Sequence, residues 1–287
     1  MHRCRPDWRR RRVTPVLGLL ACLGVGLALF PMTAQAEQSS ETRADTSTPP
    51  TVSTAMNAAI YGPSANVVDP ITELPDLRTF PAGPQRKQAF FELLVPIIEA
   101  ENARIVAQRT WLEALQASGD PLTPSEQARL TALCDDYDLE CSGNNGLASL
   151  LSRVDSVPLS MVVIQAVEES GWGTSRFARQ GNNLFGLRCF SDGCGLTQAG
   201  SGRGYQTFDS VQQAVRTYLH NLNTHDAYAE LRSLRAQLKR QGRDVTAEAL
   251  IGALEDYAVR DDYQDVLLSL LRTNDQLIAR HRSDDTV

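Results

Sequence analysis

Two adjacent carboxylates, Glu168 and Glu169, stand directly before Ser170-Gly171 and end a stretch of mostly apolar residues. Residues 161–167 of that stretch are nearly all apolar, which predicts a helix that is buried on most sides. A carboxyl group at the end of such a helix, followed by glycines that turn the chain, can lie in the wall of a cleft. Desolvation there disfavours the charged carboxylate and raises its pKa, as a general acid working near neutral pH requires.

Helix geometry separates the two carboxylates. Neighbouring residues point about 100° apart around a helix, so only one of the two can face a given cleft. Gln165 lies one turn before Glu169 and shares its face. Trp172, just after the turn, could stack on a sugar ring or pack beside the acid. The plainer alternative places both glutamates in solvent at a fraying helix end and Trp172 in the core.

The elements that must position these residues are predicted to be mainly helical. Apolar residues at helical spacing predict a long helix from Gln85 to about Ser118, and Pro96 is expected to kink or split it. The run Thr123-Pro124-Ser125-Glu126 has the N-cap, the proline and the glutamate of a capping box. Further helices are expected at about 158–170, 209–223, 226–241, 246–258 and 262–280.

The other local signals are caps, a loop and a β element. Asp209 or Ser210 is expected to cap the helix that follows, with Gln212 completing a capping box from Asp209. Residues 143–146 have the composition of a loop, and the glycine-rich stretch 184–208 is the only candidate for a short hairpin. The predicted fold is therefore mainly α, with a small β-hairpin or extended loop.

Two motifs in register indicate a family. The run Glu169-Ser-Gly-Trp-Gly-Thr-Ser175, followed by Asn182-Asn-Leu-Phe-Gly186, closely resembles the signature of bacterial glucosaminidases of glycoside hydrolase family 73. The wider chain is similar to the Bax-type proteins of that family. This likeness runs from about Arg86 to Asn274 and includes Tyr218-Leu-His-Asn-Leu-Asn-Thr-His225.

The resemblance implies a lysozyme-like α+β fold, in which a small β lobe flanks the cleft of a helical domain. It also implies cleavage of the β-1,4 bond of peptidoglycan on the reducing side of N-acetylglucosamine. Glu169 falls on the family's catalytic acid and Tyr257 on the tyrosine that lines the centre, although Tyr257 could instead pack between helices. Tyr263 is expected to support packing. The residues expected to organise the centre or shape the sugar subsites are Gln165, Trp172, Asn183 and Phe185.

One departure from the family concerns a second carboxylate. Several members carry an acidic residue, often Glu, between the signature and the next helix, whereas residues 187–208 here contain only Asp192. Asp192 is either this second carboxylate or a turn residue. Without it, two routes remain: a water activated by a weaker base, or participation of the substrate's own acetamido group. A lytic transglycosylase and a catalytically weak peptidoglycan-binding or assembly protein are the alternatives to a hydrolase.

The N-terminus has the pattern of a secretory signal. Six arginines precede an apolar run from Val13 to Phe30, and Ala34-Gln35-Ala36 has the small-x-small form of a cleavage site. We expect cleavage after Ala36. The alternatives are an uncleaved anchor, because the apolar run is near the length that spans a bilayer, and lipoprotein processing at Cys22.

Cysteine usage agrees with export to the periplasm or cell envelope. Beyond the signal, the spacing of the four cysteines makes Cys134–Cys141 and Cys189–Cys194 the economical disulfide pairs. A zinc site is the alternative, although neither spacing is C-x-x-C. No metal or organic cofactor is indicated.

Composition sets the expected organisation and partners. With 28 basic and 34 acidic residues the net charge is −6, and cleavage after Ala36 leaves 22 basic and 33 acidic residues and a net charge of −11. This acidity argues against nucleic acid as a partner and against electrostatic attachment to a membrane or wall. We expect a monomer that acts on peptidoglycan glycan strands, with no stable membrane contact unless the signal is uncleaved.

The expected parts are a signal peptide at 1–36, a Pro/Ser/Thr-rich disordered tether at 37–84, an N-terminal helical part at 85–150, the catalytic part at 151–281 and a disordered tail at 282–287.

Overall fold

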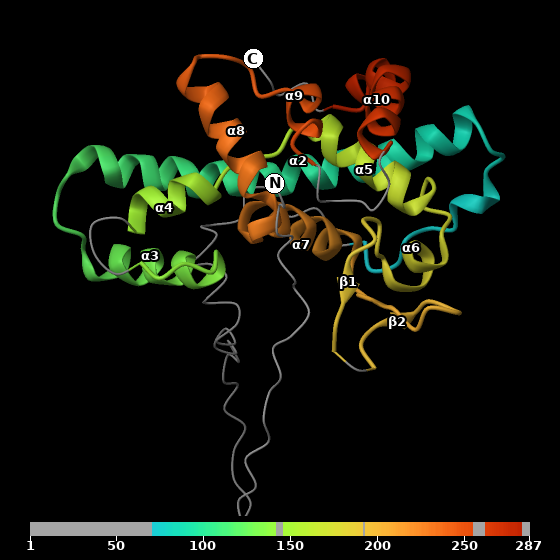
Figure 1. Cartoon of the computed structure of the whole chain (residues 1–287), viewed down its shortest axis with the longest axis horizontal. Coiled ribbons are helices and arrows are strands. Elements are labelled where there is room, and N and C mark those ends of the chain that lie inside the picture. The colour runs from blue at the N-terminus through green and yellow to red at the C-terminus, as the bar shows by residue number, and fades with distance from the viewer. Residues whose placement is uncertain (1–70, 142–145, 192, 255–261, 283–287) are drawn as a thin grey trace, which may run out of the picture. The chain divides into compact units, whose positions relative to one another are not determined.

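The computed structural model describes residues 71–141, 146–191, 193–254 and 262–282, which all fall in one compact unit. Helices dominate it, and three short strands form a single small sheet (Figure 1). The predicted fold class, mainly α with a small β lobe, is confirmed. In chain order the elements are η1 (Leu77–Thr79), α2 (Pro84–Ser118), α3 (Pro124–Asp136), α4 (Gly146–Arg153), α5 (Leu159–Ser170), α6 (Arg176–Gly181), β1 (Arg188–Cys189), β2 (Leu196–Thr197), β3 (Gly204–Tyr205), α7 (Val211–Thr224), η2 (Asp226–Tyr228), α8 (Ala229–Arg240), α9 (Ala247–Ile251) and α10 (Tyr263–Ala279).

The long helix α2 runs through Pro96 without a break, so the predicted split is wrong. Pro96 is exposed, whereas its neighbours Val95, Ile97 and Ile98 are buried. The proline therefore gives up its backbone hydrogen bond on the solvent side, and packing of the buried side chains holds the helix on both sides of it. None of the helices in the described ranges is both long and apolar enough to cross a membrane.

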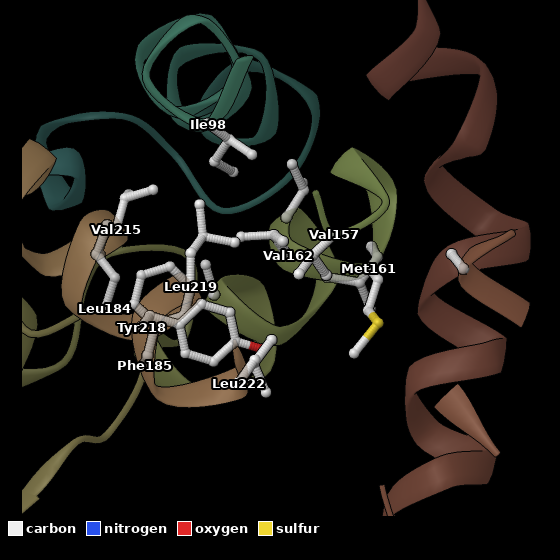
Figure 2. Close-up of a cluster of buried hydrophobic side chains, with 14 of the residues drawn as sticks. Ile98, Val157, Met161, Val162, Leu184, Phe185, Val215, Tyr218, Leu219 and Leu222 are labelled. Atoms are coloured by element: carbon white, nitrogen blue, oxygen red, sulfur yellow. The ribbon is translucent and has the colours of Figure 1, made fainter. Parts of the chain in front are cut away.

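Helix α5 lies in the centre of the core and packs against α2, α9 and α10. Every residue from Met161 to Val167 is buried, as the sequence predicted. Figure 2 shows Met161 and Val162 of this helix beside Ile98 of α2 and the apolar face of α7. Each fully buried large apolar side chain contributes about 1.5–3 kcal/mol to folding, so the position of α5 is strongly determined.

Segment 71–84, assigned to the tether from the sequence, packs on the domain. Leu74 and Leu77 are 6% and 2% exposed. The Leu74 N–H donates to Oδ1 of Asn182, and Nδ2 of Asn182 donates to the carbonyl of Thr72. The predicted boundary at 84 is therefore wrong, because two leucines in a proline-rich stretch supply enough apolar surface to dock it. The rest of the predicted tether and the signal peptide lie outside the described residues.

The β lobe is an antiparallel sheet of order β1-β3-β2, one strand more than the hairpin predicted. Its first strand is tied down by the disulfide Cys189–Cys194, and Cys134–Cys141 links the last turn of α3 to the segment after it. Both predicted disulfides are confirmed, and the zinc alternative is excluded because each of these four sulfur atoms is bonded to another.

Helix starts agree with the sequence except at α7. Thr123 and Glu126 form the predicted capping box at the start of α3. At α7, the Ser210 hydroxyl accepts from the Gln213 N–H, and the Gln213 side chain reaches back to the N–H of Asp209. The cap is therefore Ser210, and the box predicted between Asp209 and Gln212 is wrong.

Several other predicted boundaries shift. Gly146, predicted as the end of a loop, begins α4, and residues 143–145 lie outside the described ranges. The helix predicted over 226–241 is η2 followed by α8, and the one predicted over 246–258 is α9, which ends at Ile251. The helix predicted over 262–280 is α10. Of the predicted tail, residues 283–287 are outside the described part of the chain.

Candidate active site

Helix α5 ends at Ser170, one residue after Glu169, because the three residues that follow are left-handed. Gly171, Trp172 and Gly173 have φ of 57°, 61° and 73°. A Cβ on Gly173 would lie 2.9 Å from Cδ1 of Leu77, so only glycine fits there. Trp172 has a Cβ, and a non-glycine residue in the left-handed conformation is strained by about 1–3 kcal/mol. The turn keeps Glu169 at the helix terminus.

Packing of the Trp172 ring offsets the backbone strain at this residue. The ring lies 5.9 Å from the ring of Phe90 and 5.4 Å from that of Phe91, and Nζ of Lys87 lies 4.9 Å from its centroid. The side chain is half-buried against α2. The structure shows the packing role considered for Trp172, and its contact with a sugar stays a prediction.

The two carboxylate oxygens of Glu169 face different elements. The hydroxyl of Tyr263, at the start of α10, donates to Oε1 over 3.1 Å. Oε2 lies against the backbone of Gly186, where an added Cβ would be only 3.0 Å away. Gly186 has φ of 64°, which favours glycine, and a larger residue there would press on the acid. The side chain of Glu169 is half-buried.

A series of hydrogen bonds leads from the core to this carboxyl group. The hydroxyl of Tyr218 donates to Oε1 of Gln165, and Nε2 of Gln165 donates to the hydroxyl of Tyr263 over 3.4 Å. The Tyr263 hydroxyl then donates to Glu169. Each donor in the series is oriented towards the acid, and such chains strengthen one another in a low-dielectric interior.

Burial keeps both phenols protonated. It raises the pKa of Tyr218 and of Tyr263 well above the ordinary value of 10.0, and the nearby Glu169 charge raises both further. Tyr263 is 4% exposed and Tyr218 is fully buried, with the ring of Phe185 stacked on it at 4.0 Å (Figure 2). At neutral pH both hydroxyls therefore carry a proton to donate, and the Tyr263 hydroxyl can hydrogen-bond to Glu169.

Three residues predicted to touch the substrate lie beneath the surface. Gln165, Asn183 and Phe185 are 0%, 1% and 2% exposed. Asn183 donates to the carbonyls of Leu187 and Gln206 and accepts from the N–H of Leu187. A direct sugar contact does not fit this burial. Instead, Gln165 and Phe185 support the tyrosines, and Asn183 holds the turn that carries Gly186 against the acid.

Sequence reasoning missed three neighbours of this network. Tyr263 was predicted to support packing, yet its hydroxyl contacts the acid, and Tyr218 and Gly186 were given no specific role. A signal existed, because the resemblance that singled out Tyr257 rests on the run Tyr257-Ala-Val-Arg-Asp-Asp-Tyr263, which ends at Tyr263. Tyr257 and Asp192 themselves lie outside the described residues, so their predicted roles stay predictions. Within the described part of the chain, no group of three or more His, Cys, Asp or Glu side chains could hold a metal ion.

Comparisons with known proteins point to one family. The family model described as glucosaminidase, mannosyl-glycoprotein endo-β-N-acetylglucosaminidase, matches residues 146–276. The chain is 42% identical over 214 residues to the protein named bax of Escherichia coli strain K12, covering 73% of this chain and 77% of that one.

Two solved structures are also similar. The catalytic domain of the autolysin Auto from Listeria monocytogenes is 15% identical with a TM-score of 0.38, covering 71% of this chain and 92% of that one. The glycoside hydrolase domain of FlgJ from Salmonella typhimurium is 22% identical with a TM-score of 0.34, covering 53% of this chain and 91% of that one.

Proposed function

Because this chain belongs to the glucosaminidase family, we propose that it is an exported peptidoglycan hydrolase that cuts on the reducing side of N-acetylglucosamine. The observation that carries the proposal is the placement of Glu169. It ends a buried helix, accepts a hydrogen bond from Tyr263 at one oxygen and meets the Gly186 backbone with the other. We assign Glu169 as the general acid.

We propose that the catalytic proton is carried by one particular oxygen of Glu169. Since Tyr263 donates to Oε1, the proton that Glu169 transfers belongs on Oε2, beside Gly186. It passes to the leaving glycosidic oxygen as the bond to the sugar breaks. The carboxylate left behind keeps the Tyr263 hydrogen bond, which favours the charged form that the step produces. Tyr263 and Gln165 act as positioning residues.

We propose Tyr257 as the residue that organises the centre for the second half of the reaction. Asp192 is the candidate second carboxylate, and participation of the substrate's acetamido group is the route that would replace it. An Asp192→Asn variant separates these routes. Loss of lysis would assign Asp192 as a base or nucleophile, whereas wild-type lysis would leave the acetamido route.

The Glu169→Gln variant tests the acid. It keeps the side-chain shape and removes the transferable proton, so lysis of cell walls in a zymogram should fall by about 10²–10⁴-fold. Glu168→Gln is the matched control, since that neighbour points about 100° away around α5. Equal activity of Glu169→Gln and the wild type would remove Glu169 from the mechanism.

Product analysis tests the bond that is cut. Mass spectrometry of sacculi digested by the wild type should show reducing N-acetylglucosamine ends. Anhydro-muramic ends would establish a lytic transglycosylase instead, and sacculus binding without any released sugar would establish a binding protein.

Export is supported by the signal pattern of residues 1–36 and by two disulfides, which persist in oxidising compartments. Fractionation of expressing cells should place the protein in the periplasm or cell envelope, with Glu37 as its first residue. A cytoplasmic chain that begins at Met1 would contradict export.

A further inference from the structure

The β lobe presents an exposed aromatic ring. Phe190 is 85% exposed, whereas the next most exposed large apolar side chain in the described residues, Val106, is 45% exposed. The guanidinium carbon of Arg188 lies 5.6 Å from the centroid of the Phe190 ring, and Arg188 is exposed as well. The apolar Phe190 ring and the Arg188 guanidinium are therefore neighbours at the end of strand β1.

Arg188 lies in strand β1, Phe190 follows directly after it, and several bonds fix the position of this strand. Arg188 pairs with Tyr205 and Cys189 with Gly204 across the β1–β3 ladder, and Cys189 is also bonded to Cys194. The carbonyl of Arg188 accepts from Nε2 of Gln206. The backbone next to Phe190 is therefore fixed, so less conformational entropy is lost when a ligand binds here than on an unrestrained loop.

Helix α6 and the β lobe together carry charge opposite to that of the rest of the chain. Residues 174–208 contain four arginines and one aspartate, a net charge of +3 within a chain of net charge −6. Arg176, Arg179, Arg188 and Arg203 are these arginines, and within the described ranges none of them forms an ion pair. A local positive field of this kind attracts an anionic ligand.

The pair also lies close to the acid along the chain. A Cβ added to Gly186 would lie 3.0 Å from Oε2 of Glu169, so the two residues are neighbours, and Phe190 follows Gly186 by four residues. An extended chain spans at most about 3.6 Å per residue, so the two backbones are within about 14 Å of one another. A polymer bound at Glu169 can therefore reach Phe190 and Arg188 with its substituents.

We propose that Arg188 and Phe190 form a binding site for the peptide stems that peptidoglycan strands carry. The guanidinium of Arg188 pairs with a stem carboxylate, and the Phe190 ring packs against the apolar atoms of the same stem. Arg188 makes the site selective for a stem over a neutral N-acetylated sugar ring, because that ring offers no anion to pair with the guanidinium. This inference rests on the proposed function, since it names what the same cleft recognises beyond the scissile bond.

The test compares sacculi whose stem carboxylates are free with sacculi whose carboxylates are capped as methylamides. Wild-type sugar release should fall by about fivefold on capping, the upper end of what a solvent-exposed ion pair contributes. Arg188→Gln should be slowed by about the same factor on free sacculi, and capping should slow it no further. Phe190→Ala should be slower on both preparations.

Arg203→Gln is the matched control, an exposed arginine in the same lobe. It should keep the full response to capping. If Arg188→Gln responds to capping as the wild type does, or if Arg203→Gln loses the response equally, the site is not at Arg188. If Phe190→Ala matches the wild type, the ring takes no part. All three residues are exposed, so equal thermal melting will show that the variants are folded. A wild type that releases no sugar from either preparation would instead refute the proposed function.

Discussion

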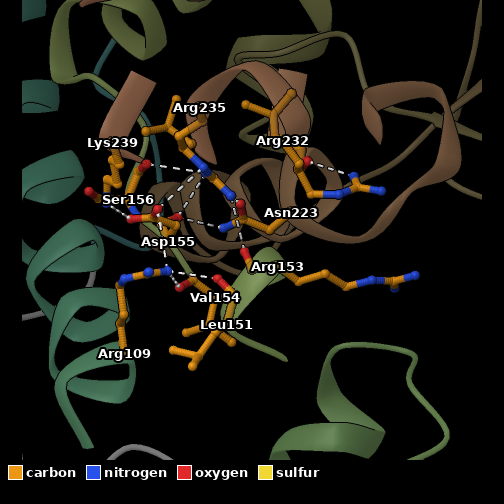
Figure 3. A network of polar contacts seen from close by, with 12 residues as sticks. Arg109, Leu151, Arg153, Val154, Asp155, Ser156, Asn223, Arg232, Arg235 and Lys239 are labelled. Atoms are coloured by element: carbon orange, nitrogen blue, oxygen red, sulfur yellow. Dashed lines mark hydrogen bonds and ion pairs between the residues drawn. The ribbon is translucent and has the colours of Figure 1, made fainter. Parts of the chain in front are cut away.

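Two carboxylates lie near the opposite ends of α5, and their surroundings differ. Asp155, before the helix, is 4% exposed and forms ion pairs with Arg109, Arg235 and Lys239 (Figure 3). Glu169, at the far end, receives a hydrogen bond from the neutral hydroxyl of Tyr263. Asp155 therefore faces three cations, whereas one of the partners of Glu169 is a neutral hydroxyl.

The Asp155 network joins elements that are distant in sequence. Arg109 comes from α2, Asn223 from α7, and Arg235 and Lys239 from α8 (Figure 3). Arg235 is 1% exposed and donates to the carbonyls of Asp155 and Ser156 and to Oδ1 of Asn223. Burial lowers the pKa of Arg235 to about 10, and Asp155 opposes that shift. We interpret this end as the part that holds α5 in place, and the Glu169 end as the part that reacts.

The largest expected effect is on stability, at the structural end. Asp155→Asn keeps the shape but leaves the buried Arg235 guanidinium without its counter-charge, so urea unfolding should show a loss of about 3–5 kcal/mol. Lysis per folded molecule should be unchanged. The control is Lys239→Met, where the side chain is 40% exposed and the loss should stay within about 1 kcal/mol. A stable but inactive Asp155→Asn variant would reverse the two assignments.

At the reacting end, Gly186→Ala should act on chemistry more than on stability. Its Cβ would press on Oε2 of Glu169, and a displacement of about 1 Å at a catalytic group can cost 10²-fold in kcat. Gly200→Ala is the matched control, because Gly200 also has positive φ, 81°, but open space around its Cβ position. Both variants should lose about 1–2 kcal/mol of stability from backbone strain.

If kcat falls equally in the two glycine variants, strain alone explains the loss and Gly186 has no specific relation to the acid. If only Gly186→Ala is slowed, the close approach between Oε2 and the loop is part of the site.

At both ends of α5, features set by residues close in sequence could be predicted from the sequence. Contacts between residues far apart in sequence could not. The bounds of α5, the shared face of Gln165 and Glu169, and both disulfides follow from spacing of a few residues. The partners of Glu169 and Asp155 do not: Tyr263 lies 94 residues after Glu169, and Lys239 lies 84 residues after Asp155. Periodicity identifies which face of a helix is buried, but not which tyrosine or arginine another helix brings to it.

The same limit applies to the orientation of the Trp172 ring and to the docking of segment 71–84. An aromatic residue in a catalytic motif suggests a substrate contact, yet the direction of its ring depends on Phe90 and Phe91 of a helix far earlier in the chain. The docking of Leu74 and Leu77 depends on Asn182 and Gly173, which the composition of a proline-rich segment does not reveal.

Tyr263→Phe tests whether the neutral donor matters to the acid. The ring stays in the core, and only the hydrogen bond to Oε1 of Glu169 is lost, so kcat should fall by about tenfold with KM nearly unchanged, as for one lost hydrogen bond of about 1.4 kcal/mol. The basic limb of the pH–rate profile should move to higher pH, because a carboxylate that loses a hydrogen bond gives up its proton less readily. Tyr205→Phe, in the β lobe, is the control. An unmoved basic limb would make Tyr263 a packing residue only.

The effect confined to alkali concerns the two phenols that lead to Glu169. The folded pKa values of Tyr218 and Tyr263 are raised above 10.0, so below pH 10 both phenols are protonated in the folded and unfolded states and contribute no pH dependence. Above pH 10 the unfolded chain releases these protons while the folded protein keeps them. The free energy of unfolding should then fall by about 1.4 kcal/mol per pH unit for each tyrosine. Urea unfolding at pH 8, 9, 10 and 11 should show this decline in the wild type and in Asp155→Asn, and a smaller decline in the double variant Tyr218→Phe/Tyr263→Phe. Equal declines in all three proteins would mean that the two phenols ionise in the folded state, and Tyr263 would then not be a lasting neutral donor to Glu169.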